Sequence, residues 1–392
     1  MKSFGIKGQI VTPSRVIPAG TLLIEGKEIG GVFSPDEEKG KLPLLDFGEA
    51  YIFPGLIDLH IHGARGKDFM DANLADTREI SRFLLEQGVT GFLATTLTEG
   101  KERIKKAISA MVAFAKEGFP GSKMLGIHLE GPYLSCKRRG AHNPAYLRSP
   151  DREETEELLA AGQGWVKRVT LAPELPGAMD LITYLATQDI LVSLGHSQAD
   201  YQTSLQAFEK GAQLITHLFN GMDPLHHRQP NLLSFALGFD QVWVEMIADT
   251  IHVAPEIMKI ALKCKGERMI LISDAVRPTG LGDGSYEFGG ETMEVKDGIA
   301  RITPSQSLAG STITLNQALS HLKKHFNLSL PRLADLGSLS PAKLLRVDKK
   351  LGSLERGKMA NVVVFDQSFQ PKEVFLEGEM KGSDKSENVD GL

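Results

Sequence analysis

The chain has 392 residues, of which 42% are hydrophobic and 24% charged, as expected of a globular protein that buries a large core. Its net charge of −5 argues against a nucleic-acid partner, and no run of about 18 apolar residues predicts a segment that crosses a membrane. Only two cysteines occur, and residues 1–20 contain no apolar leader segment, so we expect a cytoplasmic protein without disulfides.

Both ends of the chain carry short β-favouring runs. Residues 1–50 contain "GQIVT" and "GTLLIEGKEIGGVF", and the far end contains "GKMANVVVFD" and "PKEVFLEGEM", with Gly and Pro between them. We therefore predict a small β-sandwich domain formed by both termini, residues 1–52 and 353–381. The last residues, 382–392, are small and polar, which predicts a flexible tail.

Between these ends, over residues 53–352, apolar β-favouring runs alternate with helical patterns. The runs are "GLIDLH" (55–60), "GFLATT" (91–96), "MLGIHL" (124–129), "VKRVTLA" (166–172), "ILVSLG" (190–195), "AQLITH" (212–217), "VWVEMIA" (242–248) and "RMILIS" (268–273). Helical patterns mark residues 77–88, 204–211 and 255–266, the last beginning with Pro and ending with Gly. Eight strands that alternate with helices predict a (β/α)8 TIM-like barrel.

Histidines and carboxylates follow six of the eight predicted strands. They are His60, His62, Glu130, His196, His217, His252 and Asp274. Because the strands of such a barrel end at one mouth, we expect these side chains to share one concave space. Side chains alternate along a strand, so His60 and His62 point to the same face. Imidazole nitrogens and carboxylate oxygens suit Zn2+ and Fe2+, so the pattern predicts a metal site.

Each of these residues also has an ordinary structural explanation. A single histidine near a strand end is more often a hydrogen-bonded loop residue, Glu130 could cap a turn, and Asp274 could be a helix N-cap. The metal-site hypothesis therefore rests on their coincidence at strand ends. Three segments are weaker candidates: residues 137–144, 220–230 and 307–314 could contact an anion, or be a solvated basic loop, a turn and a helix start.

The residues at the strand ends lie in recognisable motifs. These are "PGLIDLHIHG", "GIHLEGPY", "GHS", "THLFNGM", "SDA" and "LAGSTIT". Together they resemble the amidohydrolase superfamily and, within it, the N-acetylglucosamine-6-phosphate deacetylase family. The similarity runs from the N-terminal strands to "GSLERGKMANVVVFD". The pieces "HLEGP" and "THLFNGM" are specific, whereas the opening HxH is shared across the superfamily.

The resemblance implies a role for each matching position. The ligands of the principal metal are matched by Glu130, His196 and His217, and a pair that holds a second metal in some members is matched by His60 and His62. One or two divalent ions per subunit, Zn2+ or Fe2+, are thereby implied. Substrate-contacting positions are matched by Ala141, His142, Asn220, Gly221, Arg228, Asp249, Thr250, Ile251, His252, Leu308, Ala309 and Gly310.

The implied reaction is hydrolysis of the acetamide of N-acetyl-D-glucosamine 6-phosphate to D-glucosamine 6-phosphate and acetate. Asp274 matches the catalytic acid/base of the family, and His142 would stabilise the developing oxyanion. Asn220–Gly221 and Arg228 would hold the phosphate. In the family, the matching arginine reaches the substrate of the neighbouring subunit, which implies a homodimer.

Several alternatives remain open from the sequence. The substrate could be N-acetylgalactosamine 6-phosphate, because the C4 stereochemistry is not determined. A cyclic amidase of the superfamily usually carries a carboxylated Lys after the fourth strand, where this chain reads "TLAPE". A non-catalytic scaffold would be expected to have lost ligands that this chain keeps. Arg277-Pro278 stands where many relatives have small residues, and we expect it to alter acyl or sugar preference.

Overall fold

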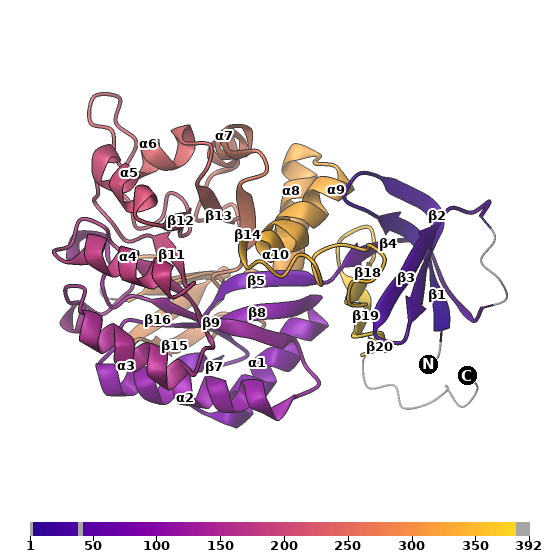
Figure 1. Ribbon diagram of the computed structural model, residues 1–392, viewed down its shortest axis with the longest axis horizontal. Helices are drawn as coiled ribbons and strands as arrows, with labels where there is room; N and C mark the ends of the chain where they lie inside the picture. Colours follow the sequence, from indigo (N-terminus) through magenta and orange to yellow (C-terminus); the bar gives the residue numbers. More distant parts are fainter. Residues whose placement is uncertain (1–2, 38–41, 304, 382–392) are drawn as a thin grey trace. The chain divides into compact units, whose positions relative to one another are not determined.

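Eight parallel strands form the barrel that the sequence predicts (Figure 1). They are β5 (Leu56–Ile61), β8 (Val89–Thr96), β9 (Lys123–Glu130), β10 (Val166–Leu171), β11 (Leu191–Leu194), β12 (Ala212–Ile215), β13 (Trp243–Ile247) and β14 (Met269–Ile272). Neighbouring strands are hydrogen-bonded along the sheet, and a bridge between Ile61 and Ala275 joins its two edges. The predicted (β/α)8 fold is therefore confirmed.

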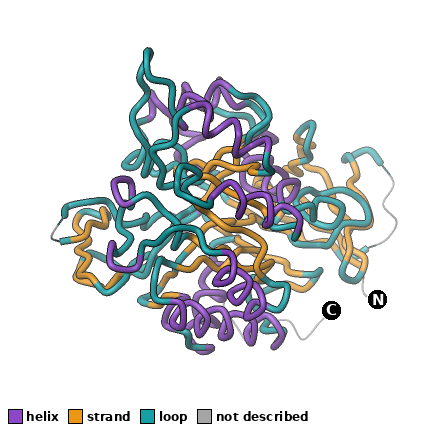
Figure 2. The backbone as a smooth tube through the Cα atoms, turned by 60° about the vertical axis from the view of Figure 1, so that its left-hand side comes forward, coloured by secondary structure: helices purple, strands orange, loops and turns teal. Residues whose placement is uncertain are grey.

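Along the chain, helices occupy the intervals between these strands. Figure 2 distinguishes helices, strands and loops by colour. The helices are α1 (Leu74–Glu86), α2 (Lys101–Glu117), α3 (Arg152–Gly162), α4 (Ala178–Thr187), α5 (Tyr201–Glu209), α6 (Leu232–Gly238) and α7 (Pro255–Lys265), with α8 (Leu315–Phe326) later in the chain. The three helical patterns read from the sequence correspond to α1, α5 and α7. Local chemistry explains their starts, because Asp200 accepts from the N–H of Thr203 and Pro255 stands in the first turn of α7.

A three-stranded antiparallel sheet follows β14, which the sequence analysis did not predict. It consists of β15 (Gly284–Phe288), β16 (Glu291–Lys296) and β17 (Ile299–Ile302). The side chains of Phe288, Met293 and Ile302 are buried. The chain then returns along β17, where Ala309 N–H donates to the carbonyl of Ala300 (3.1 Å).

The remaining elements of the barrel region and of the C-terminal half are short. They are β6 (Gly63–Ala64), β7 (Lys67–Asp68), η1 (Phe69–Asp71), η2 (Cys136–Arg138), η3 (Pro144–Tyr146), α9 (Leu330–Ala334), the π-helical η4 (Asp335–Leu339) and α10 (Ser340–Leu344).

Strands from both ends of the chain form one seven-stranded sheet, in the order β20-β19-β18-β4-β1-β2-β3. These strands are β1 (Ser3–Val11), β2 (Val16–Glu25), β3 (Glu28–Phe33), β4 (Leu44–Pro54), β18 (Val362–Phe365), β19 (Pro371–Leu376) and β20 (Glu379–Met380). Strand β18 pairs with β4, and Ile6, Ile52 and Val362 are buried in one apolar cluster. The terminal β-structure is thus built from both ends, as predicted.

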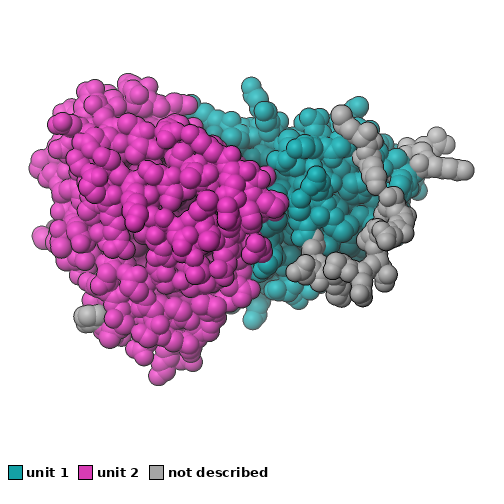
Figure 3. Space-filling model, turned by 90° about the horizontal axis from the view of Figure 1, so that it is seen from below, with its two compact units in different colours: residues 1–57, 84–91, 315–392 teal, residues 58–83, 92–314 magenta. Residues whose placement is uncertain are grey.

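The computed structural model describes residues 3–37, 42–303 and 305–381. The chain divides into two units, residues 1–57, 84–91 and 315–392 in one and 58–83 and 92–314 in the other (Figure 3). The boundaries expected at residues 52–53 and 352–353 stay predictions, and the expected tail, 382–392, lies outside the described residues. None of the helices in the described ranges combines the length and apolar character needed to cross a bilayer.

An ion pair is buried inside the barrel. Arg168 of β10 and Glu245 of β13 are both 0% exposed, and Nη1 of Arg168 contacts Oε1 of Glu245. The guanidinium also donates to Ser193 Oγ (2.8 Å), to the carbonyl of Leu59 (3.1 Å) and to Thr216 Oγ1 (3.1 Å). Burial alone would raise the pKa of Glu245, but the charge of Arg168 holds it at about 2. The pair is therefore charged, and it connects strands from across the barrel.

We expect Arg168→Met to lower the free energy of unfolding by about 3–5 kcal/mol, because Glu245 would be left buried without its counter-charge. Urea unfolding of chelator-treated protein measures this without a contribution from metal binding. Lys101→Met, which breaks an exposed pair with Glu157, is the matched control and should cost far less. Equal losses in the two variants would contradict the assignment of Arg168.

Candidate active site

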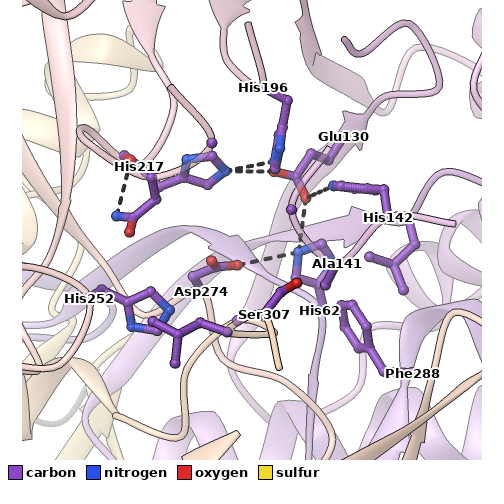
Figure 4. A pocket seen from close by; sticks show the side chains of 16 residues that line it. His62, Glu130, Ala141, His142, His196, His217, His252, Asp274, Phe288 and Ser307 are labelled. Atoms are coloured by element: carbon purple, nitrogen blue, oxygen red, sulfur yellow. Dashed lines mark hydrogen bonds and ion pairs between the residues drawn. The ribbon is translucent and has the colours of Figure 1, made fainter. Parts of the chain in front are cut away.

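A cavity of about 240 Å³ lies at the carboxyl ends of the barrel strands (Figure 4). Most of its lining was predicted from the sequence: His62, Glu130, Ala141, His142, His196, His217, Asn220, Gly221, His252, Asp274, Leu308 and Gly310. Four further residues line it, namely Leu97, Gly140, Phe288 and Ser307. The strand-end residues are thus brought together, as the barrel topology requires.

Three of the lining residues have a left-handed backbone two positions after the end of a strand. The φ angles are 48° at His196, 29° at His217 and 50° at Asp274. Non-glycine residues adopt this region at a cost of about 1–3 kcal/mol each, and such residues concentrate at functional sites. The conformation turns the chain out of the strand while the side chain remains in the cavity.

Glu130, the last residue of β9, lies at the centre of the site. Its Oε1 is 3.3 Å from Nε2 of His196 and 3.2 Å from Nε2 of His217. Its Oε2 is 3.1 Å from Nε2 of His62 and 3.4 Å from Nε2 of His142. All five side chains are buried. Nε2 of His60 also lies 3.4 Å from Oε1, so one carboxylate faces five imidazoles.

A second group of ligand atoms adjoins the first. The Oδ1 atom of Asp274 is 3.4 Å from Nε2 of His60 and 3.3 Å from Nε2 of His62. Both the set His60, His62 and Asp274 and the set Glu130, His142 and His196 have ligand atoms within 4.8 Å of one another, which suits a metal ion. His60 itself is fully buried and is not part of the cavity lining.

Hydrogen bonds on the far side of the rings turn two imidazoles toward the centre. Nδ1 of His196 lies 2.8 Å from the carbonyl of Arg138, and Nδ1 of His60 lies 3.3 Å from Oε2 of Glu245. Since a carbonyl can only accept, His196 carries its proton on Nδ1 and presents a lone pair at Nε2. Metal-binding histidines are oriented by such second partners.

The charges of this donor set match a bound cation. Burial alone would lower the pKa of His62, but the carboxylates of Asp274 and Glu130 raise it to about 9. The pKa of His60 is also raised well above its ordinary value, against the effect of burial, by the charges of Glu130 and Asp274. The two carboxylates thus favour positive charge at His60 and His62. Nε2 of His196 lies 2.9 Å from Nε2 of His217, so both nitrogens point into the same small space, as two ligands of one cation do. The residues present fit a divalent metal.

His142 has a defined tautomer. The N–H of Thr98 donates to its Nδ1 (3.3 Å), so neutral His142 carries its proton on Nε2, the atom that faces Glu130. Burial lowers the pKa of His142 to about 4, although the charge of Glu130 opposes this shift. His142 is therefore a neutral hydrogen-bond donor at physiological pH.

His252 is oriented by the loop after β13. Its Nδ1 lies 2.6 Å from Oδ2 of Asp249, whose Oδ1 accepts from the N–H groups of Ile251 and His252 (2.8 Å each). Of this predicted segment, only His252 lines the cavity, and Asp249, Thr250 and Ile251 lie behind it or at the surface. Asp249 is thus a support for His252.

Two glycines of the lining have positive φ and no room for a side chain. A Cβ on Gly221 (φ 61°) would lie 2.8 Å from Nδ1 of His196, and one on Gly310 (φ 54°) would lie 2.8 Å from the carbonyl oxygen of Asp274. The neighbouring Ala309 is buried outside the lining and is bonded to β17.

Arg228 is exposed to solvent. It lies in an exposed loop between β12 and α6, and its Nη1 is 2.8 Å from Nε2 of His227. It is not part of the cavity lining of its own chain. This placement is compatible with a role toward a second subunit.

The sequence analysis did not identify Leu97 and Phe288, and it included Gly140 and Ser307 only within the weaker candidate segments 137–144 and 307–314. Leu97 directly follows the second strand, so its position at a strand end could have identified it. Gly140 and Ser307 adjoin predicted residues. Nothing in the sequence indicated Phe288, because this residue reaches the cavity through the three-stranded sheet β15–β17, which was not predicted. We refer to this sheet as the inserted sheet.

Comparisons with known proteins agree with this geometry. The model of the amidohydrolase family matches residues 51–392. The N-acetylglucosamine-6-phosphate deacetylase of Vibrio furnissii is 38% identical over 336 residues, which cover 86% of this chain and 84% of that protein. The N-acetylgalactosamine-6-phosphate deacetylase of Escherichia coli O157:H7 is 36% identical, with coverage of 83% and 86%.

A solved structure matches over almost the whole chain. It is a mutant N-acetyl-D-glucosamine-6-phosphate deacetylase from Mycobacterium smegmatis in complex with N-acetyl-D-glucosamine-6-phosphate. The TM-score is 0.91 and the identity 32%, with 97% of this chain and 99% of that chain covered. The chain therefore belongs to the amidohydrolase family, in the group that contains the N-acetylglucosamine-6-phosphate deacetylases.

Proposed function

We propose that this protein hydrolyses the acetamide of N-acetyl-D-glucosamine 6-phosphate to D-glucosamine 6-phosphate and acetate. The observation that carries the proposal is the convergence of Glu130, His196, His217 and Asp274 on one buried cavity. The relatives named above, and the substrate bound to the Mycobacterium smegmatis protein, support this assignment. Because one relative acts on the galactosamine epimer, both sugar phosphates belong in the assay.

The proposed cofactor is a divalent ion, Zn2+ or Fe2+, held by Glu130, His196 and His217, with a second ion at His60 and His62. These ligand types suit both metals. When bound, such an ion polarises the amide carbonyl and acidifies a water molecule. The remaining chemistry belongs to side chains of the protein.

Asp274 is the proposed acid/base. Burial alone would raise its pKa, but the charge of His60 and the contact with His62 hold it at about 2, so the carboxylate is ionised at neutral pH. It accepts a proton from the water that attacks the carbonyl carbon. It then delivers this proton to the amide nitrogen as the C–N bond breaks, which releases the amine and acetate.

Neutral His142 is the proposed donor to the developing oxyanion, through Nε2–H. Its tautomer is fixed before substrate binds, so the donor needs no reorganisation during the reaction. His252 and the backbone at Asn220, Gly221 and Leu308–Gly310 would position the sugar phosphate.

We further propose a cytoplasmic homodimer in which Arg228 binds the substrate phosphate in the neighbouring subunit. Arg228 is exposed and lies outside the cavity lining of its own chain. Apolar side chains are exposed nearby in sequence and on α7, among them Leu225 (60%) and Ile260 (49%), as at a surface that a second subunit would cover. Both cysteines, Cys136 and Cys264, are free, which fits a reducing compartment.

Asp274→Asn should retain the fold and the metal but lose activity by about 10²- to 10⁴-fold, because a carboxamide cannot transfer the proton. Acetate release from N-acetylglucosamine 6-phosphate measures the loss, and elemental analysis verifies equal metal content. Near-normal turnover of this variant would contradict the role of Asp274. Wild-type protein that is loaded with metal and releases no acetate from either epimer would contradict the proposed function as a whole.

Glu130→Gln and His196→Ala should lower metal content and activity together, since each removes one ligand of the principal site. The double variant His60→Asn/His62→Asn should keep one metal equivalent and part of the activity. Elemental analysis per subunit distinguishes these outcomes, with His226→Ala, in the exposed loop, as the control. Full metallation of His196→Ala, or unchanged stoichiometry in the double variant, would show that these histidines are structural.

Arg228→Ala should raise KM for the 6-phosphorylated sugar by roughly 10- to 100-fold, because a charge-assisted bond to phosphate is lost. Turnover of unphosphorylated N-acetylglucosamine, which we expect to be a poor substrate because it lacks the phosphate, should change little and serves as the internal control.

Mixing Arg228→Ala subunits with Asp274→Asn subunits should restore activity if the arginine acts in the neighbouring subunit. One site of each hybrid dimer then carries both wild-type residues. Hybrids that are no more active than either parent, with subunit exchange verified, would contradict the dimer proposal.

A further inference from the structure

Most side chains that line the cavity are polar, and the apolar ones are Leu97, Ala141, Phe288 and Leu308. Phe288, the last residue of β15, and Leu97, which follows β8, are each 4% exposed and line the cavity. The ring centroid of Phe288 lies 6.0 Å from that of His62, edge to face. A Cβ added to Gly289 would lie 3.9 Å from Cδ1 of Leu97, so the turn of the hairpin is placed against Leu97. We refer to Leu97 and Phe288 as the apolar wall.

Phe288 lies on the opposite side of the cavity from His252, one of the residues assigned to the sugar phosphate. Figure 4 shows Phe288 and His142 on one side and His252 and His217 on the other. The sugar ring and the phosphate carry polar groups, whereas the acyl group ends in a methyl. Apolar lining selects the apolar part of a ligand, and polar groups fix its orientation.

We propose that Leu97 and Phe288 form the acyl pocket that restricts the enzyme to short acyl groups, and that Arg277 is the positioning residue that holds this pocket closed. The proposal rests on the proposed deacetylase function and names which part of the substrate the inserted sheet recognises. Neither the family match nor the relatives assign a role to these three residues.

Arg277 connects the inserted sheet to the loop after β5. Its Nη1 and Nη2 donate to the two carboxylate oxygens of Asp71 (2.8 Å each), and Nη1 also donates to the carbonyl of Gly66 (3.0 Å). Its Nε donates to the carbonyl of Glu287 (3.1 Å), and Nη2 lies 3.3 Å from Oε2 of the same residue. Glu287 directly precedes Phe288 in β15. The guanidinium therefore fixes the backbone at the start of the apolar wall.

The geometry of these bonds requires arginine. A paired contact to a carboxylate, together with bonds to two carbonyls, uses the planar fork of the guanidinium, which a lysine ammonium cannot reproduce. The backbone reinforces the link, since the N–H of Gly66 donates to the carbonyl of Arg277 (2.7 Å). Arg277 touches no lining atom assigned to catalysis, so its effect passes through the position of Phe288.

The experiment compares kcat/KM for N-acetyl-, N-propionyl- and N-butyrylglucosamine 6-phosphate. For the wild-type protein we expect a fall of at least about tenfold for each added methylene, because a filled apolar pocket rejects extra volume. Phe288→Ala and Leu97→Ala should each raise the propionyl-to-acetyl ratio by about tenfold or more, with acetate release from the natural substrate retained in part. Met293→Ala is the matched control, since Met293 is buried in the same sheet and does not line the cavity.

Arg277→Met should raise the same ratio by several-fold, at unchanged metal content, and Arg277→Lys should restore the wild-type ratio only in part. Lys296→Met, at an exposed position of β16, is the control for loss of a cation from this hairpin. A residue needed only for stability would lower the yield of folded protein without changing the ratio between two substrates. The ratio therefore separates positioning from folding.

Unchanged ratios in Phe288→Ala and Leu97→Ala, with acetate release intact, would overturn the acyl pocket and leave the deacetylase function standing. If Phe288→Ala does not fold, Phe288→Leu and Leu97→Ala provide the same test. An equal shift in Met293→Ala would overturn the specific role of the apolar wall in favour of general loosening of the hairpin. Absence of acetate release by the metal-loaded wild-type protein would remove both proposals together.

Discussion

The buried ion pair of Arg168 and Glu245 is the interaction on which the site depends. One oxygen of Glu245 neutralises the guanidinium, and the other lies 3.3 Å from Nδ1 of His60 and accepts from the N–H of His217 (3.0 Å). A charged pair in such surroundings is tolerated only when its remaining hydrogen-bonding groups are satisfied, and here two of the proposed ligands satisfy them. The side chains that fill the barrel interior and the proposed metal ligands therefore belong to a single hydrogen-bonded network. His128, between Thr95 (3.3 Å) and Thr170 (2.7 Å), belongs to the same polar interior.

Three site residues that follow barrel strands have backbone conformations that lower the stability of the fold. His196, His217 and Asp274 adopt left-handed backbone conformations, which are unfavourable for residues that carry a side chain. Such conformations concentrate at functional sites, and an ordinary apolar loop would not need them. The cost is offset locally at Asp274. Its N–H donates to the carbonyl of His60 (2.9 Å), and its carbonyl accepts from the N–H of Ser311 (2.8 Å). The acid/base is thus held between the first strand of the barrel and the segment that follows the inserted sheet.

Much of this arrangement could be predicted from the sequence, because apolar runs mark the strands and the residues that follow them mark the mouth. The pattern could not identify partners distant in the chain. Arg168 and Glu245 each appear as a charge within an apolar run, and neither indicates the other across 77 positions. The inserted sheet was missed for a similar reason, since the sequence of its short alternating strands does not indicate which part of the fold they pack against. Phe288 therefore entered the site only with the structure, as did the bonds of Arg277 to the loop after β5.

The position of the Glu130 carboxylate has a consequence for how metal ions would occupy the site. Its two oxygens face different histidines, Oε1 toward His60, His196 and His217 and Oε2 toward His62 and His142. Glu130 thus contributes its negative charge to both ligand sets, and Asp274 adds a second negative charge to the set with His60 and His62. A cation that occupies one set reduces the attraction felt at the other, and linkage makes this coupling reciprocal. Two ions would accordingly bind in sequence with unequal affinity, and a substitution at Glu130 would alter both steps, whereas one at His196 would act mainly on a single step.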